Sequence, residues 1–184
     1  CMGDDVTSTT GSNKAAYLAA DAFEAPSDLK GVNDLWNWYY NIIKASNYVL
    51  DCAKYLQVDN SEVSEQLGQA YFWRAYAYYG LVRTWGPVPL APEAVLSVDV
   101  DNIKDDIPCA TVEEVYNYIV KDLKAAEDCN LPEKYPDGSK RIGDANVFVS
   151  AQAVKSTLAS VYMSMAGYPL KKTDYYALAA DKAK

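Results

Sequence analysis

The chain of 184 residues contains no histidine. Histidine is the side chain that most often serves as a general base near neutral pH, and its imidazole is a common ligand of zinc. The absence therefore excludes serine or cysteine triads with a histidine base, and it excludes histidine-ligated zinc. Most hydrolase mechanisms lose their commonest base in this sequence.

Cysteine is scarce, and the four cysteines, Cys1, Cys52, Cys109 and Cys129, are widely spaced. None belongs to a Cys-x-x-Cys pair of the kind that zinc sites and thioredoxin-like centres use. Cys109 and Cys129 flank a predicted helix of about 18 residues, roughly 27 Å long, which is too far for one disulfide. We interpret the cysteines as small apolar side chains buried on helices.

An excess of basic charge and a long apolar run are also missing. Lysine and arginine number 17 against 25 aspartate and glutamate, which gives a formal net charge of −8. Binding to a phosphate backbone needs clustered lysine and arginine, so we expect no nucleic-acid partner. Half of the residues are apolar, yet no run has the length of a membrane span, which indicates a globular chain with a sizeable core.

Helical periodicity is what the sequence has in abundance, most clearly from Gly68 to Leu90. Apolar residues recur there at the spacing of one helix face, and aromatic residues occupy a second face. The pattern stops at Gly86-Pro87, because both residues oppose another helical turn. We predict a helix buried on two sides. Its aromatic core residues are expected to be Tyr71, Trp73, Tyr78 and Trp85.

Helical patterns also flank this central stretch. The earlier helix is predicted at about 33–57, and Ser61 and Ser64 are expected to cap the central one. Thr111 and Glu114 form a capping box that opens a third helix. A further helix is predicted at about 150–166, and another begins after Thr173 or Asp174. The apolar face of the helix at 150–166 is expected to consist of Val154, Leu158, Val161, Tyr162 and Met165. Nothing alternates with a period of two for long enough to indicate a sheet, so the prediction is an all-α repeat architecture.

Two polar residues interrupt the predicted apolar faces. Arg74 stands where an aliphatic side chain is expected, and a buried arginine usually pairs with a carboxylate or with carbonyl groups. We predict a structural salt bridge for it. Asn47 is expected to satisfy a neighbouring turn of backbone.

Five stretches together resemble the SusD/RagB family, the lipoproteins that capture nutrients, chiefly glycans, at the outer surface of certain Gram-negative bacteria. The run from Gly68 to Leu90 resembles the signature helix of that family, and the run from Leu35 to Leu50 resembles its first repeat helix. The other three are an early loop at Met2 to Lys14 and two later helices at Glu113 to Pro132 and Ala153 to Gly167. Their order and spacing agree along nearly the whole chain.

The resemblance implies an all-α, tetratricopeptide-like helical-repeat scaffold with long loops. We expect the N-terminal part of one domain, divided into a loop-rich first segment at 1–31, a long helix pair at 32–90, a loop at 91–110 and further repeat helices at 111–184. The chain is expected to be trimmed at both ends. The signal peptide and lipidated cysteine would precede it, and much of the binding surface would follow Lys184.

The resemblance also implies a function. The protein would be a non-catalytic subunit, exposed at the outer membrane and held there only through a lipid anchor outside this chain. Its partners would be an oligosaccharide or polysaccharide and a SusC-like TonB-dependent outer-membrane transporter, and no cofactor is implied.

Candidate ligand-binding residues lie near the start of the chain. Sugar rings stack their C–H faces on tryptophan and tyrosine, and their hydroxyls bind carboxylates. Trp36, Trp38 and Tyr40, near a helix start, could form an exposed aromatic platform, and Asp4 and Asp5 could bind hydroxyls. A buried aromatic cluster and a solvated loop remain the alternatives.

Two other functions stay open. In the first, the helical repeats grip a protein partner and the aromatic residues only build the core. In the second, a glycosidase would need two carboxylates that face each other across a pocket, and the sequence offers no clear pair. No metal site is predicted, because the acidic run at 99–106 lacks the ligand spacing and the turn glycine of an EF-hand.

Overall fold

The computed structural model describes residues 30–56, 59, 61–91, 107–135 and 148–184. The helices are α2 (Lys30–Tyr55), α3 (Ser64–Trp85), α4 (Val112–Asp128), α5 (Ala151–Ala166) and α6 (Tyr175–Lys182). Two short strands, β1 (Val88–Pro89) and β2 (Cys109–Ala110), pair antiparallel. The all-α prediction is confirmed. The chain divides within α2 into two compact units, Cys1–Tyr40 and Asn41–Lys184.

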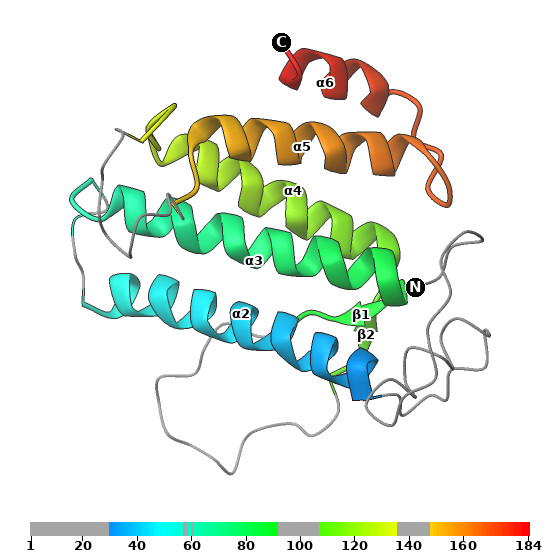
Figure 1. Ribbon diagram of the computed structural model, residues 1–184, viewed down its shortest axis with the longest axis horizontal. Helices are drawn as coiled ribbons and strands as arrows, with labels where there is room; N and C mark the ends of the chain where they lie inside the picture. The colour runs from blue at the N-terminus through cyan, green and yellow to red at the C-terminus, as the bar shows by residue number, and fades with distance from the viewer. Residues whose placement is uncertain (1–29, 57–58, 60, 92–106, 136–147) are drawn as a thin grey trace, which may run out of the picture. The chain divides into compact units, whose positions relative to one another are not determined.

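Helices α3 to α6 pack in chain order, each against the next (Figure 1). Between α3 and α4 the pairing runs antiparallel, because Tyr78 meets Tyr118 while the earlier Arg74 meets the later Asp122. Apolar residues fill the space between the helices, and those on α5 are buried at the predicted positions, namely Val154, Leu158, Val161, Tyr162 and Met165. The repeating antiparallel arrangement follows from short amphipathic helices that each bury a face on a neighbour.

One glycine sets how closely α3 approaches the end of α4. A Cβ atom placed on Gly68 would lie 2.9 Å from Cys129 Cβ and 2.9 Å from Leu131 Cδ2. Real Cβ atoms do not approach that closely, so the hydrogen on Gly68 permits the contact. Ser64 adds a polar link at the same place, where its hydroxyl donates to the carbonyl of Cys129 at 2.6 Å.

The helix ends match the sequence in some places and not in others. The Thr111 hydroxyl accepts from the Glu114 amide while Glu114 reaches back to the Thr111 amide, so the predicted capping box is confirmed. The predicted serine caps of α3 were wrong. Val63 stands at the N-cap without a side-chain bond, because Ser64 donates instead to a tertiary carbonyl.

Helix α2 begins at Lys30 rather than near Asn33 and ends at Tyr55 rather than near Gln57. Helix α3 stops at Trp85 as predicted, where Gly86 has a φ of 75° that favours glycine.

The three cysteines of the described residues are free, and Cys52 and Cys129 are half-buried. Cys109 is exposed, which contradicts the predicted burial on a helix, because it lies in β2 outside the packed helix faces. Cys1 lies outside the described residues.

Charged side chains connect the last helix to α4. Lys182 on α6 lies 2.8 Å from a carboxylate oxygen of Glu127, and Lys172, just before α6, pairs with Glu113.

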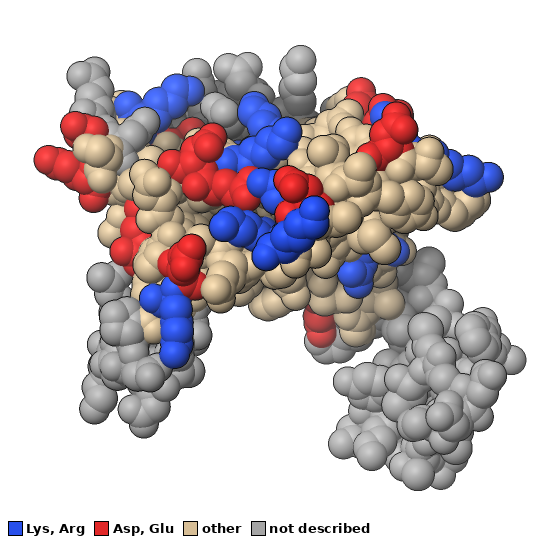
Figure 2. Space-filling view, turned by 90° about the horizontal axis from the view of Figure 1, so that it is seen from above, with Lys and Arg blue, Asp and Glu red and all other residues tan. Residues whose placement is uncertain are grey.

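Acidic and basic side chains are intermixed on the face that Figure 2 shows. None of the described helices is both long and apolar enough to cross a membrane.

Candidate functional site

The aromatic residues predicted to bind ligand lie in the first half of α2. Trp36 and Tyr40 are one turn apart, and their ring centroids are 4.9 Å from each other at an interplanar angle of 42°. Residues four apart share a helix face, so this contact follows from the spacing. Both side chains are half-buried.

Trp38 lies on a different face of α2. Residues two apart in a helix do not face each other, so Trp38 cannot join the Trp36–Tyr40 pair. It packs against Tyr39 instead, with centroids 5.3 Å apart, and 53% of its surface is exposed. The structure therefore brings two of the three predicted aromatic residues together and leaves the third as the most exposed tryptophan of the described chain.

Asp4 and Asp5, the other predicted ligand residues, lie outside the described residues. Their role as hydroxyl ligands stays a prediction.

A second group of aromatic residues on α3 is more exposed than expected. Tyr78 is fully buried as predicted, and Tyr71 and Trp85 are half-buried, but Trp73 is 37% exposed. Trp73 packs on Tyr76 of the same helix, with ring centroids 5.8 Å apart. The core prediction for Trp73 was therefore wrong. Gln66 and Thr84 lie on the same side of the helix in the sequence, and this polar signal could have identified an exposed face.

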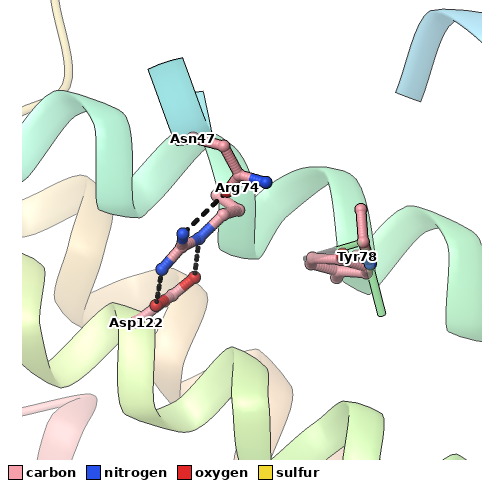
Figure 3. Close-up of polar contacts among 5 residues, drawn as sticks. Asn47, Arg74, Tyr78 and Asp122 are labelled. Carbon is pink, nitrogen blue, oxygen red and sulfur yellow. Dashed lines mark hydrogen bonds and ion pairs between the residues drawn. The ribbon is translucent and has the colours of Figure 1, made fainter. Parts of the chain in front are cut away.

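A buried polar network joins three helices (Figure 3). The Arg74 guanidinium donates to Asp122 through Nε at 2.7 Å and Nη2 at 2.8 Å, a bidentate ion pair, and Nη1 donates to Asn47 Oδ1 at 2.8 Å. The predicted salt bridge of Arg74 is confirmed. Asn47 has a partner that the prediction did not include, because its side-chain oxygen accepts from Arg74 on another helix.

The electrostatics of this network are those of a structural ion pair. The side chains of Arg74 and Asp122 are 7% and 1% exposed. Burial disfavours the charged arginine, but the hydrogen bonds and charge of Asp122 outweigh it and raise the pKa of Arg74. Burial raises the pKa of Asp122, and the hydrogen bonds and charge of Arg74 oppose that increase. Arg74 also lies near the rings of Tyr118 and Tyr71, 5.1 Å and 5.7 Å from their centroids.

The described residues bring no three histidine, cysteine, aspartate or glutamate side chains together in a way that could hold a metal ion. The acidic run at 99–106 lies outside them. Within the described part of the chain, the geometry offers aromatic surfaces and hydrogen-bonding groups, which suit the binding of an uncharged polar ligand.

The sequence matches known proteins over most of its length. Residues 2–163 match the model of a family described as starch-binding and associating with the outer membrane. A SusD-like protein P2 of Formosa agariphila is 36% identical over 97 residues, which are 53% of this chain and 19% of that protein. A SusD-like protein of Bacteroides ovatus is 26% identical over 142 residues, 76% of this chain and 23% of that one. The chain thus spans about one-fifth of these relatives' length.

Solved structures show the same fold. A SusD superfamily protein from Parabacteroides distasonis is 29% identical, with a TM-score of 0.74, over 91% of this chain and 33% of that chain. A structure named with a xylogluco-oligosaccharide has 24% identity and a TM-score of 0.72 over 88% of this chain and 30% of its own. A laminarin-binding SusD-like protein has 22% identity and a TM-score of 0.67 over 92% and 33% of the two chains.

Proposed function

The chain belongs to the family of SusD-like, starch-binding, outer-membrane-associated proteins, and from that premise we propose that it captures oligosaccharide at the cell surface for a TonB-dependent outer-membrane transporter. It would do so without catalysis and as a lipid-anchored protein. The structures named with a xylogluco-oligosaccharide and with laminarin support a carbohydrate ligand. Because those two glycans differ, the comparisons leave the sugar of this protein open.

The observation that carries the proposal in this chain is the exposed aromatic surface of α2. Trp38 presents a large apolar ring to solvent, and Trp36 and Tyr40 add a tilted pair on another face. Exposed aromatic rings of this kind stack on the C–H faces of sugars, while their polar edges bind hydroxyls. We propose Trp36, Trp38 and Tyr40 as ligand residues on this ground, with Asp4 and Asp5 as further candidates.

The test is retardation of the protein in native gels that contain different polysaccharides. We expect at least one polysaccharide to slow the wild type, and Trp38→Ala to weaken binding on the order of tenfold, which corresponds to about 1.4 kcal/mol. Trp73→Ala is the matched control, since it removes a partly exposed tryptophan from α3. Equal retardation of wild type and Trp38→Ala would show that Trp38 does not bind the glycan. Absence of retardation by any polysaccharide would refute the carbohydrate proposal.

A protein-binding scaffold is the second candidate, and the exposed Trp73–Tyr76 pair favours it. Aromatic residues are enriched in protein interfaces, and this pair lies on one face of α3. Co-purification with a transporter tests both candidates. If a Trp73→Ala, Tyr76→Ala double variant still binds glycan but no longer co-purifies with the transporter, this face of α3 contacts the protein partner.

A further inference from the structure

A hollow of about 270 Å³ lies between the second half of α2 and the first half of α3. Leu50, Asp51, Ala53, Leu67, Tyr71 and Arg74 contribute to its lining. All of them belong to the unit Asn41–Lys184. The hollow includes none of the aromatic residues proposed above as ligands, so it is a separate feature of the chain.

The lining combines an apolar wall with polar groups. Leu50, Leu67 and the ring of Tyr71 offer apolar surface, and Asp51 offers a half-buried carboxylate. A sugar ring likewise has apolar and polar parts, with C–H groups on its faces and hydroxyls at its edge. Asp51, Lys54 and Arg74 make up much of the lining, and a ligand rich in hydroxyls needs such polar groups to fix its orientation.

Arg74 brings hydrogen-bond donors to the hollow from a buried position. A guanidinium has five N–H groups, and Arg74 uses three of them on Asp122 and Asn47. The other two make no hydrogen bond to a described residue, although the guanidinium also lies over the rings of Tyr118 and Tyr71. An acceptor oxygen on a ligand would satisfy such a donor, and buried donors gain more from an acceptor than exposed ones do.

The charges around the hollow balance. Asp122 neutralises Arg74, and Asp51 and Lys54 contribute one charge of each sign. The lining therefore offers no net charge to attract an ion, whereas an uncharged polyol can exchange its hydrogen bonds to water for hydrogen bonds to these polar groups. The volume is also small, below the about 300–1,000 Å³ of clefts that take drug-sized ligands.

We propose that this hollow binds a single residue of a neutral oligosaccharide, as a subsite apart from the aromatic surface of α2. Leu50, Leu67 and Tyr71 would contact the ring faces, and Asp51 and Arg74 would bind hydroxyls as acceptor and donor. The choice of a carbohydrate rests on the proposed function. The small volume and balanced charge select a neutral ring within that class.

The test uses a side chain that fills the hollow. Ala53→Trp places an indole at the half-buried lining position, and Ala45→Trp places the same side chain at an exposed position of α2 as the control. Amide NMR spectra are recorded with glucose, galactose, mannose, xylose and glucuronate at millimolar concentration, and circular dichroism checks the fold of each variant. Asp51→Ala is a second variant that removes an acceptor without adding bulk.

We expect a neutral sugar to shift the amides of the lining residues in the wild type and in Ala45→Trp. Ala53→Trp should abolish these shifts, and Asp51→Ala should weaken binding at least several-fold. Lining amides that respond to no neutral sugar, or that respond more strongly to glucuronate, would overturn the inference. So would equal binding by folded Ala53→Trp and Ala45→Trp.

Polysaccharide gels separate this inference from the proposed function. Retardation of wild type and Ala53→Trp to the same extent would refute the subsite and leave glycan capture standing. Absence of retardation in the wild type would refute glycan capture, and the NMR titration with single sugars would then decide the subsite by itself.

Discussion

Arg74 is the residue on which most of the buried polar contacts converge. It holds Asp122 through two hydrogen bonds and Asn47 through a third, and it is almost fully excluded from solvent. Taking one partner away from such a pair leaves a buried charge without compensation, which costs more than the pair itself contributes. The network therefore makes the fold sensitive to substitution at any of its members.

We expect Asp122→Asn to lower the free energy of unfolding by about 3–5 kcal/mol, because Arg74 keeps its charge and loses its countercharge. The double variant Arg74→Leu, Asp122→Leu should be nearer to the wild type, since it removes both charges. Glu127→Gln, which breaks the more exposed pair with Lys182, is the control and should cost less than about 1 kcal/mol. Urea unfolding followed by circular dichroism measures the stability of all three variants. A double variant with a lower free energy of unfolding than Asp122→Asn would contradict the expected cost of an unpaired buried charge.

Gly68 gives a second prediction for a single residue. Gly68→Ala should destabilise the protein by about 1–3 kcal/mol, because the added methyl would lie 2.9 Å from Cys129 and Leu131 and force α3 away from them. Gly31→Ala in α2 is the matched control. Nothing lies within 4 Å of a Cβ at Gly31, so the better helix propensity of alanine should leave stability unchanged or raised. Thermal melts compare the stability of the two variants. A Gly68→Ala variant as stable as the wild type would show that Cys129 and Leu131 can move to make room for the methyl group.

At the scale of the helix, the start of α4 is the end most completely specified by local sequence. Thr111 and Glu114 satisfy each other's backbone amides without help from the rest of the chain. Thr111→Ala should therefore cost about 0.5–2 kcal/mol of stability. Ser150→Ala at the start of α5, where the hydroxyl accepts from the Ala153 amide, offers a comparison on a second helix. Denaturation of both variants checks whether the two caps are equivalent.

The same capping box predicts a pH dependence. Hydrogen bonds from the Thr111 side chain and backbone lower the pKa of Glu114. A carboxyl whose pKa is lower in the folded state stabilises the protein above its unfolded pKa, about 4.3, and loses that contribution as the pH falls through the folded pKa. The stability difference between wild type and Glu114→Ala should therefore be full at pH 7 and shrink below about pH 4.3. Glu133→Ala, an exposed glutamate before Tyr135, is the control, and a difference independent of pH would contradict the assignment.

Elements of the fold could be predicted where local sequence decides them. The capping box at Thr111, the stop after Trp85 and the buried face of α5 all depend on residues a few positions apart, and these were predicted. The cap of α3 and the role of Asn47 depend on Cys129 and Arg74, which are distant in the sequence, so no local pattern contained them. For the candidate site, the Trp36–Tyr40 contact followed from spacing. The hollow between α2 and α3 needed the packing of two helices and could not be predicted.

For the molecule as a whole, burial is unevenly distributed over the unit Asn41–Lys184. Fully excluded side chains such as Tyr78, Leu123 and Leu158 belong to α3, α4 and α5, whereas Ala179 is the buried residue of α6. Segments with few buried apolar contacts open at lower free energy than the core. We therefore expect α6 amides to exchange with deuterium faster than those in the middle of α3, α4 and α5. Hydrogen exchange followed by mass spectrometry tests this, and protection of α6 equal to that of α4 would contradict it.

The position of Asp122 has a consequence for how the chain can be divided. Residues 41–55 of α2 and the whole of α3 are joined by a short connection, and a peptide of these two helices would keep the contact between Asn47 and Arg74. Such a peptide would lack the countercharge of Arg74, because Asp122 belongs to α4, and it would expose the apolar face of α3 that packs on α4. The two helices therefore do not make an autonomous folding unit. The smallest fragment that can be expressed as a stable protein has to extend beyond Asp122, so this ion pair sets a lower limit on the length of any useful truncation.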